Sequence, residues 1–251
     1  MQKQDPERRT TAVIVGAGEF AAEAFKERVL KDGNMIQETL LIAADGGLRY
    51  LQECGLTPDV ILGDFDSLGY VPDYTNTRVI TLPVEKDVTD TEAALSYAWE
   101  RSCRRILLFG MSGDRPDHFL ANLQLMAAYS RRGSEMLLAA PTFMVYALAG
   151  NKQGPTTCAG TTAGQPASVS APTSCQGPAH LTLHGRAGCI FSIFTLQAEA
   201  RGVTISGDAK YRLEKATLSN ENSLGVSNAF TGPEVSIEVK EGTLLVFQYT
   251  T

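Results

Sequence analysis

Carboxylate-bearing residues recur in the first half of the chain, in short polar motifs that directly follow apolar runs. The motif Gly63-Asp64-Phe65-Asp66-Ser67 comes after the run DVIL. If the strand pleat persists, Asp64 and Asp66 lie on one side, because strand side chains alternate with a period of two. Paired ionised carboxylates are costly unless a cation lies between them, and oxygen ligands favour magnesium or manganese. The motif therefore predicts a magnesium site; the alternative is a turn made by Asp64 and Ser67, with Asp66 as a cap.

A lysine and two further aspartates precede a helical pattern downstream. Thr89 and Glu92 have the spacing of a capping box, and Asp90 suits the positive end of the helix dipole. This structural explanation leaves Lys86 and Asp87 unexplained. A lysine beside carboxylates at a helix N-terminus is well placed for a phosphate that is bridged to a metal ion.

A glycine-rich loop, residues 110–118, follows the apolar run RILLF. Its two glycines permit close approach of the backbone to a ligand, and Arg115 offers a fork of donors for phosphate. Asp117 equally suits the role of a helix cap. His118 is the only histidine in the first half of the chain, which excludes a multi-histidine metal site there.

A competing motif, Gly16-Ala17-Gly18-Glu19-Phe20-Ala21, fits the dinucleotide fingerprint, with Asp45 at the end of the next strand as the ribose acid. Glycines after a first strand also serve simply to turn the chain tightly. A nicotinamide-dependent oxidoreductase therefore stays open as an alternative. Hydride transfer does not need so many aspartates, whereas metal-assisted phosphoryl or pyrophosphoryl transfer does, because its catalysis is mainly positioning and charge neutralisation.

The elements that must position these motifs alternate between strand and helix over residues 1–150. The strand patterns show little internal alternation, and most precede a helical pattern, which is typical of a parallel sheet covered on both faces. In such sheets ligands lie at the carboxyl ends of the strands, so the motifs are expected to converge on one edge. The expected strands are Thr11–Val15, Leu40–Ala44, Asp59–Leu62, Arg78–Leu82, Arg105–Phe109 and Met136–Ala140, and the helices Glu19–Leu30, Gly47–Glu53, Asp90–Arg101 and Asp117–Arg131.

The second half of the chain has a different pattern. Residues 151–179 are predicted to be a flexible insertion, because Gln153–Ala179 contains no charged residue and cannot bury enough apolar surface to offset its ordering entropy. An ordered irregular loop is the alternative. From His180 onward the period changes to two, in short strands separated by turn residues, so residues 180–251 are predicted to form a β-sandwich.

The composition narrows the function classes further. The chain has 251 residues and a net charge of −6, which disfavours nucleic acid or an anionic membrane as partner and suits a cationic substrate or a metal ion. No apolar run reaches the ~18 residues that cross a bilayer, and the polar N-terminus lacks a signal-peptide core. The five cysteines are scattered, which argues against a zinc site or a disulfide framework. A cytoplasmic protein is expected.

Taken together, the motifs resemble those of the thiamine pyrophosphokinase family. The likeness spans roughly Val13 to Phe247, in the family's order. It is carried by Asp45-Gly46-Gly47, Gly63-Asp64-Phe65-Asp66-Ser67, Lys86-Asp87-x-Thr89-Asp90, the 110–118 loop with Leu120-Ala121-Asn122, and Ser223-Leu224-Gly225-Val226-Ser227-Asn228.

The resemblance implies ATP and thiamine as substrates, AMP and thiamine diphosphate as products, and Mg²⁺ as cofactor. It implies a homodimer whose active site lies between the α/β domain of one subunit and the β domain of the other. In the implied mechanism the thiamine hydroxyl attacks the β-phosphorus of ATP, and Asp90 or Asp87 accepts the proton. The resemblance implies that magnesium and the ATP phosphates are bound by Asp64, Asp66 and Asp90. It implies that nucleotide and phosphate are bound by Asp45, Gly46, Gly47, Lys86 and Arg115. Thiamine is expected near Asp117, Ser227 and Asn228.

The sequence departs from the family's pattern in three places. Asp114 stands where a small neutral residue is expected, Ala229 stands where a larger one is usual, and the insertion is longer than the usual connection. Two further alternatives stay open: a pyrophosphokinase that acts on a pterin-like alcohol, and a non-catalytic nucleotide or metal sensor.

Overall fold

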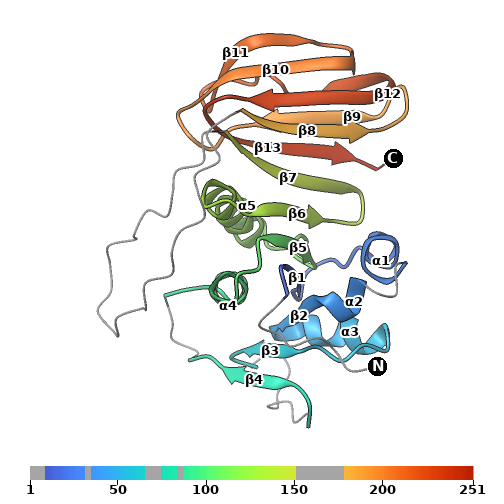
Figure 1. Cartoon of the computed structure of the whole chain (residues 1–251), viewed down its shortest axis with the longest axis vertical. Coiled ribbons are helices and arrows are strands. Elements are labelled where there is room, and N and C mark those ends of the chain that lie inside the picture. Colours follow the sequence, from blue (N-terminus) through green and yellow to red (C-terminus); the bar gives the residue numbers. More distant parts are fainter. Residues whose placement is uncertain (1–8, 32–34, 66–74, 84–86, 151–177, 251) are drawn as a thin grey trace. The chain divides into compact units, whose positions relative to one another are not determined.

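The computed structural model describes residues 9–31, 35–65, 75–83, 87–150 and 178–250 (Figure 1). The chain divides into two compact units. The first takes in Met1–Met126, Ser134–Tyr146 and Phe247–Thr251, and the second Ala127–Gly133 and Ala147–Val246. The predicted flexible insertion lies almost entirely outside the described residues.

The first unit is built on a parallel sheet with the strand order β6-β5-β1-β2-β3-β4. From β1 the chain adds β2, β3 and β4 on one side, and then crosses back to place β5 and β6 on the other. The order therefore reverses between β1 and β5, which creates a switch point at the carboxyl ends of these two strands. The strands are β1 (Thr11–Val15), β2 (Thr39–Ala44), β3 (Val60–Gly63), β4 (Arg78–Thr81), β5 (Arg105–Phe109) and β6 (Glu135–Ala139).

Both faces of this sheet are buried at every strand except the edge strand β4, which explains the unbroken apolar runs in the sequence. Val13 and Val15 join a core cluster with side chains from α1, the π-helix that follows it, and α3. The alternate residues Ala12 and Ile14 are also fully buried, and α4 packs against β1, β2 and β3. Figure 1 shows α4 and α3 on opposite sides of the strands. The helices are α1 (Ala22–Phe25), the π-helix Lys26–Leu30, α2 (Met35–Glu38), α3 (Leu48–Glu53), α4 (Asp90–Glu100) and α5 (Pro116–Arg131).

The second unit is antiparallel. The long strand β12 pairs with β10 along one side, while on the other its first residues pair with β9 and its last with β8. Such a change of partner along one strand is how chains pass between the layers of a sandwich. The strands are β8 (Ala179–His184), β9 (Ile190–Phe194), β10 (Glu199–Ala209), β11 (Leu213–Ser219) and β12 (Asn228–Val239); β7 (Phe143–Gly150) and β13 (Gly242–Tyr249) contribute residues to both units.

The predicted fold class, a parallel α/β part followed by an antiparallel β part, is confirmed. Several elements differ from the expected ones. The helical pattern at Glu19–Leu30 begins only at Ala22, and Phe143–Gly150 forms a strand that was not predicted. The strand β10 extends beyond the predicted Gly202–Ile205 on both sides, because register shifts between Arg201 and Val203 and between Gly207 and Ala209 let it bend and continue. Among the described helices, none is long and apolar enough to cross a bilayer.

Candidate active site

The loops after β1 and β5 pack directly against each other. The backbone N–H groups of Gly16 and Gly18 donate to the carbonyl oxygens of Phe109 and Gly110, both at 2.8 Å, and Glu19 donates to Ser112 at 2.7 Å. A Cβ atom on Gly18 would lie 2.1 Å from the Ser112 oxygen, so this position requires glycine. Loop packing thus explains the glycines of the fingerprint-like motif. Their N–H groups already donate to backbone carbonyl oxygens, so they are not available to bind a pyrophosphate.

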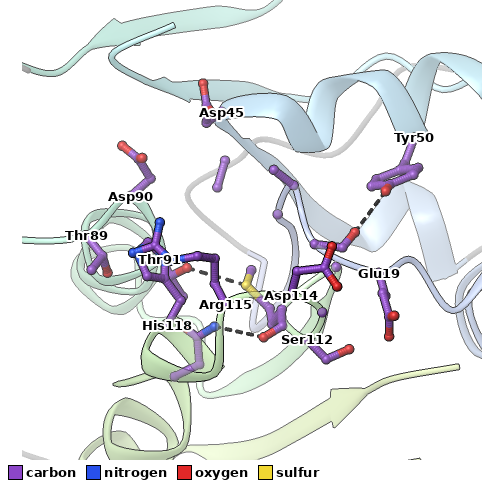
Figure 2. Close-up of a pocket in the computed structure, with 18 of the residues that line it drawn as sticks. Glu19, Asp45, Tyr50, Thr89, Asp90, Thr91, Ser112, Asp114, Arg115 and His118 are labelled. Atoms are coloured by element: carbon purple, nitrogen blue, oxygen red, sulfur yellow. Dashed lines mark hydrogen bonds between the residues drawn. The ribbon is translucent and has the colours of Figure 1, made fainter. Parts of the chain in front are cut away.

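A cavity of about 790 Å³ opens at this switch point (Figure 2). The loops after β1, β2 and β5 line it, together with the N-termini of α4 and α5. Figure 2 shows Asp90 and Asp45 on one side of the cavity and Tyr50 and Glu19 on the other. The polar lining residues are Glu19, Asp45, Tyr50, Thr89, Asp90, Thr91, Ser112, Asp114, Arg115, His118 and Asn122.

Asp45 has an unusual backbone conformation. It follows β2 directly and opens the 3₁₀ turn Asp45–Gly47 with φ of 46°, a left-handed conformation that few non-glycine residues adopt. Strained positions of this kind gather at ligand sites, where the surrounding structure holds them. The turn brings the half-buried Asp45 side chain to the cavity wall, while Gly46 and Gly47 are buried behind it.

The N-terminus of α4 carries the second acidic position. Thr89 caps the helix, because its hydroxyl accepts a hydrogen bond from the Glu92 N–H at 3.1 Å, as the capping-box spacing predicted. Asp90 occupies the first turn and lines the cavity. Thr91 donates from its hydroxyl to the Met111 sulfur at 3.4 Å, which ties this helix end to the loop after β5.

Arg115 and Asp117 form a two-point pair at the start of α5. The Arg115 Nε–H and Nη2–H donate to the two carboxylate oxygens of Asp117, at 3.0 and 2.7 Å. The Arg115 guanidinium holds the pKa of the Asp117 carboxyl well below its usual range, and the carboxylate in turn raises the pKa of Arg115. Arg115 lines the cavity, whereas Asp117 is not among its lining residues.

The remaining predicted positions in the first unit separate into two groups. Asp64 and Asp87 are described and are not among the lining residues of the cavity, while Asp66 and Lys86 lie outside the described residues. The pleat that would align Asp64 with Asp66 does not persist. The strand β3 ends at Gly63, and Phe65 is buried with φ of 60°, so the chain turns within the motif.

Several cavity residues were not predicted to belong to the site. Tyr50 comes from α3, stacks on Phe20 at 4.7 Å, and donates its hydroxyl proton to the Gly18 carbonyl at 2.9 Å. The buried Asn122 donates to the Met111 carbonyl at 3.0 Å and so holds the loop after β5. No sequence signal distinguishes Tyr50 from an ordinary core aromatic. Asn122 belongs to the Leu120-Ala121-Asn122 segment of the family resemblance, which assigns it no role.

Ser227 and Asn228 lie in the second unit. Ser227 has φ of 56°, and its N–H donates to the Ser192 hydroxyl at 3.0 Å. Asn228 is only 1% exposed. Its side-chain oxygen accepts from the N–H groups of Tyr211 and Ala229, both at 2.9 Å, and its amide donates to the Tyr211 carbonyl at 2.6 Å. The Asn228 carboxamide therefore holds the turn between β10 and β11.

The described residues that line the cavity include more acidic than basic side chains. Among its described lining residues, Glu19, Asp45, Asp90 and Asp114 carry carboxylates and Arg115 carries the guanidinium. Such an excess of carboxylates attracts cations and favours oxygen-binding metal ions such as Mg²⁺. Within the described residues, no group of three or more histidine, cysteine, aspartate or glutamate side chains is close enough to hold a metal ion. The predicted set of Asp64, Asp66 and Asp90 includes a residue outside that part of the chain.

The fold and the cavity together define an α/β protein with a cavity at the topological switch point of its parallel sheet, where such proteins bind ligands. A family model described as the thiamin pyrophosphokinase catalytic domain matches residues 34–138, and one described as the thiamin pyrophosphokinase vitamin B1 binding domain matches residues 176–244. Together the two matches take in more than half of the chain. The chain therefore belongs to the thiamin pyrophosphokinase family.

The chain is also similar to individual proteins of this family. A thiamine pyrophosphokinase from Bacillus subtilis is 36% identical over 97 residues, which cover 36% of this chain and 44% of that relative. The crystal structure of thiamine pyrophosphokinase from Bacillus subtilis matches with a TM-score of 0.71 at 20% identity, covering 96% of this chain and 99% of that one. The structure from Geobacillus thermodenitrificans gives 0.69 at 23% identity, covering 96% and 98%. At these identities the structural likeness supports the fold alone.

Proposed function

We propose that this protein transfers pyrophosphate from ATP to the hydroxyl group of thiamine, giving thiamine diphosphate and AMP. The observation that carries the proposal is the acidic cavity at the switch point between β1 and β5, in a chain that both thiamin pyrophosphokinase family models match. Thiamine carries a permanent positive charge, and a cavity lined by several carboxylates favours such a substrate.

The residues of the first unit take distinct roles in this proposal. Asp64, Asp66 and Asp90 would hold Mg²⁺, whose chemistry is to neutralise charge on the phosphate oxygens. Arg115 and Lys86 would bind phosphate, and the Asp45–Gly47 turn would bind the nucleotide. Asp87 or Asp90 would accept the hydroxyl proton; Asp90 lines the cavity and is also assigned to Mg²⁺, whereas Asp87 is exposed and outside the described lining.

A homodimer with a shared site is also part of the proposal. In the second unit, exposed apolar side chains gather around β9, and we refer to Ile190, Phe194, Leu196, Tyr211 and Leu224 as the β9 patch. Backbone hydrogen bonds connect its parts, since Lys210 donates to Ala229, a β-partner of Ile190, and Ile193 donates to Gly225. Such a patch fits a second copy of the chain, whose acidic cavity would supply the rest of the thiamine site.

The first experiment is a reaction of the purified protein with ATP, Mg²⁺ and thiamine, with products separated by chromatography. We expect AMP and thiamine diphosphate, both lost when EDTA removes the metal. ADP in place of AMP would indicate transfer of a single phosphoryl group and contradict the proposal. ATP binding without AMP release would favour a sensor, and turnover of a pterin alcohol alone would favour the other pyrophosphokinase.

The substitution Asp64→Asn tests the metal assignment. We expect turnover to fall by roughly a thousandfold or more, because a neutral amide cannot balance the charge of the metal ion and the phosphates. The control is Glu214→Gln, which removes a carboxylate on the exposed surface of β11. An Asp64→Asn enzyme with normal turnover, or one as weakly affected as the control, would refute the role of Asp64.

A further inference from the structure

Arg115 and Asp117 differ in their access to the cavity. Arg115 lines it, while Asp117 is not among the described lining residues. Both carboxylate oxygens of Asp117 accept hydrogen bonds from the Arg115 fork, at 3.0 and 2.7 Å. In this arrangement both oxygens of the Asp117 carboxylate are engaged by the residue that lines the cavity.

The Asp117 carboxylate is itself fixed at the start of α5. It lies in the first turn of the helix, where the positive end of the helix dipole favours a negative charge. The His118 backbone N–H also donates a hydrogen bond to it, which contributes with Arg115 to holding the pKa of Asp117 low. A carboxylate that is anchored in this way is a fixed support for the flexible arginine side chain.

We propose that Asp117 is a positioning residue that holds the Arg115 guanidinium against the cavity, so that the remaining N–H donors of the fork meet the phosphates of ATP. This assignment rests on the proposed function and differs from the thiamine contact that the family resemblance implies for Asp117. It follows from the two-point geometry, because Asp117 takes only one edge of the guanidinium and leaves the other edge for a phosphate.

Exposed ion pairs often contribute little to the stability of a folded protein. The side chains of Arg115 and Asp117 are 67% and 63% exposed, so solvent screens their attraction. The proposal does not need the pair to stabilise the fold, since it concerns only the direction in which Arg115 points. The chain also offers a comparison pair on β10, where Arg201 donates from Nε and Nη2, at 2.8 and 2.6 Å, to a single carboxylate oxygen of Glu199 two residues away.

The test is a double-mutant cycle with Asp117→Asn, Arg115→Lys and the combination of both. KM for ATP and for thiamine are measured by turnover, and MgATP affinity is measured separately by calorimetry. We expect Asp117→Asn to raise KM for ATP about fivefold and to leave KM for thiamine unchanged. In the Arg115→Lys background, which has already lost the fork, the same change should have no further effect.

Two further variants complete the cycle. Asp117→Glu keeps a carboxylate and should restore most of the ATP affinity, whereas Glu199→Gln should change neither KM. A rise in KM for thiamine with Asp117→Asn, present in both backgrounds, would overturn the proposal in favour of direct thiamine contact. Unchanged MgATP affinity in Asp117→Asn, or additive losses in the double variant, would overturn it as well.

Failure of this inference is distinct from failure of the proposed function. If the wild-type protein forms no thiamine diphosphate, the proposed function is wrong, and the calorimetric cycle with MgATP still measures the coupling of Asp117 to Arg115. If the wild-type protein is active and the cycle shows independent effects, the function stands and the role of Asp117 is refuted.

Discussion

Asn228 belongs to the motif that the family resemblance assigns to thiamine, yet its side chain is buried. Its buried carboxamide is occupied by three hydrogen bonds, two of them to the backbone of Tyr211. Tyr211 itself is 56% exposed. A buried polar side chain that fixes an exposed aromatic preorganises a surface for contact with a ligand or a partner.

The substitution Asn228→Ala tests this role. It leaves the Tyr211 N–H and carbonyl without their partner, so we expect a loss of about 2 kcal/mol in the free energy of unfolding and faster amide exchange at Tyr211 and Ala229. The measurements are urea denaturation and hydrogen exchange. Asn222→Ala is the matched control, because the exposed Asn222 accepts a single hydrogen bond from Leu224. Equal effects of the two substitutions would contradict the positioning role.

Among the elements, the loops after β1 and β5 determine the shape of the cavity. They touch through the backbone at Gly16, Gly18 and Gly110, and Asn122 and Thr91 hold Met111 from the two adjoining helices. The fingerprint-like glycines therefore serve the packing of two loops. This arrangement also weakens the support for a nicotinamide-binding alternative, since the N–H groups of Gly16, Gly18 and Glu19 already have acceptors.

The substitution Gly18→Ala tests the loop packing. The added methyl group would lie 2.1 Å from the Ser112 carbonyl oxygen, so one loop must move. We expect the first unit to lose about 2–3 kcal/mol of stability and the cavity to lose MgATP affinity. Fluorescence of Trp99, the only tryptophan in the chain and part of α4, reports the unfolding. Ala17→Ser, at an exposed position in the same loop, is the control; a Gly18→Ala protein as stable as this control would contradict the packing argument.

For the molecule as a whole, the proposal of a shared site makes activity depend on assembly. Phe194→Asp places a charge within the β9 patch and is expected to shift the protein from dimer to monomer in sedimentation velocity, with loss of thiamine turnover. MgATP binding to the first unit should persist. The control, Ser206→Asp, adds the same charge at an exposed position of β10 outside the patch. A monomeric wild-type protein with full activity would refute the shared site.

Much of the architecture could be predicted from local pattern. The strands β1, β2 and β5 are buried on both faces, and their sequences are largely unbroken apolar runs. The spacing between Thr89 and Glu92 correctly predicted the start of α4. Prediction was weakest where tertiary contacts override local preference. The helix after β1 starts late because Gly16, Gly18 and Glu19 are bonded to the loop after β5, whose position no local pattern shows.

The sequence by itself determined the fold class, the family motifs and the acidic character of the site, because these depend on residue type, periodicity and spacing. Only the tertiary structure decided which motif residues reach the cavity. Asp45, Asp90 and Arg115 line it, whereas Asp117 is paired with Arg115 outside the described lining, and the buried Asn228 is hydrogen-bonded to the Tyr211 backbone. The physical reason is that facing a cavity depends on backbone turns such as those at Asp45 and Phe65, and on hydrogen bonds between segments far apart in the chain. Neither is encoded in the spacing of a motif.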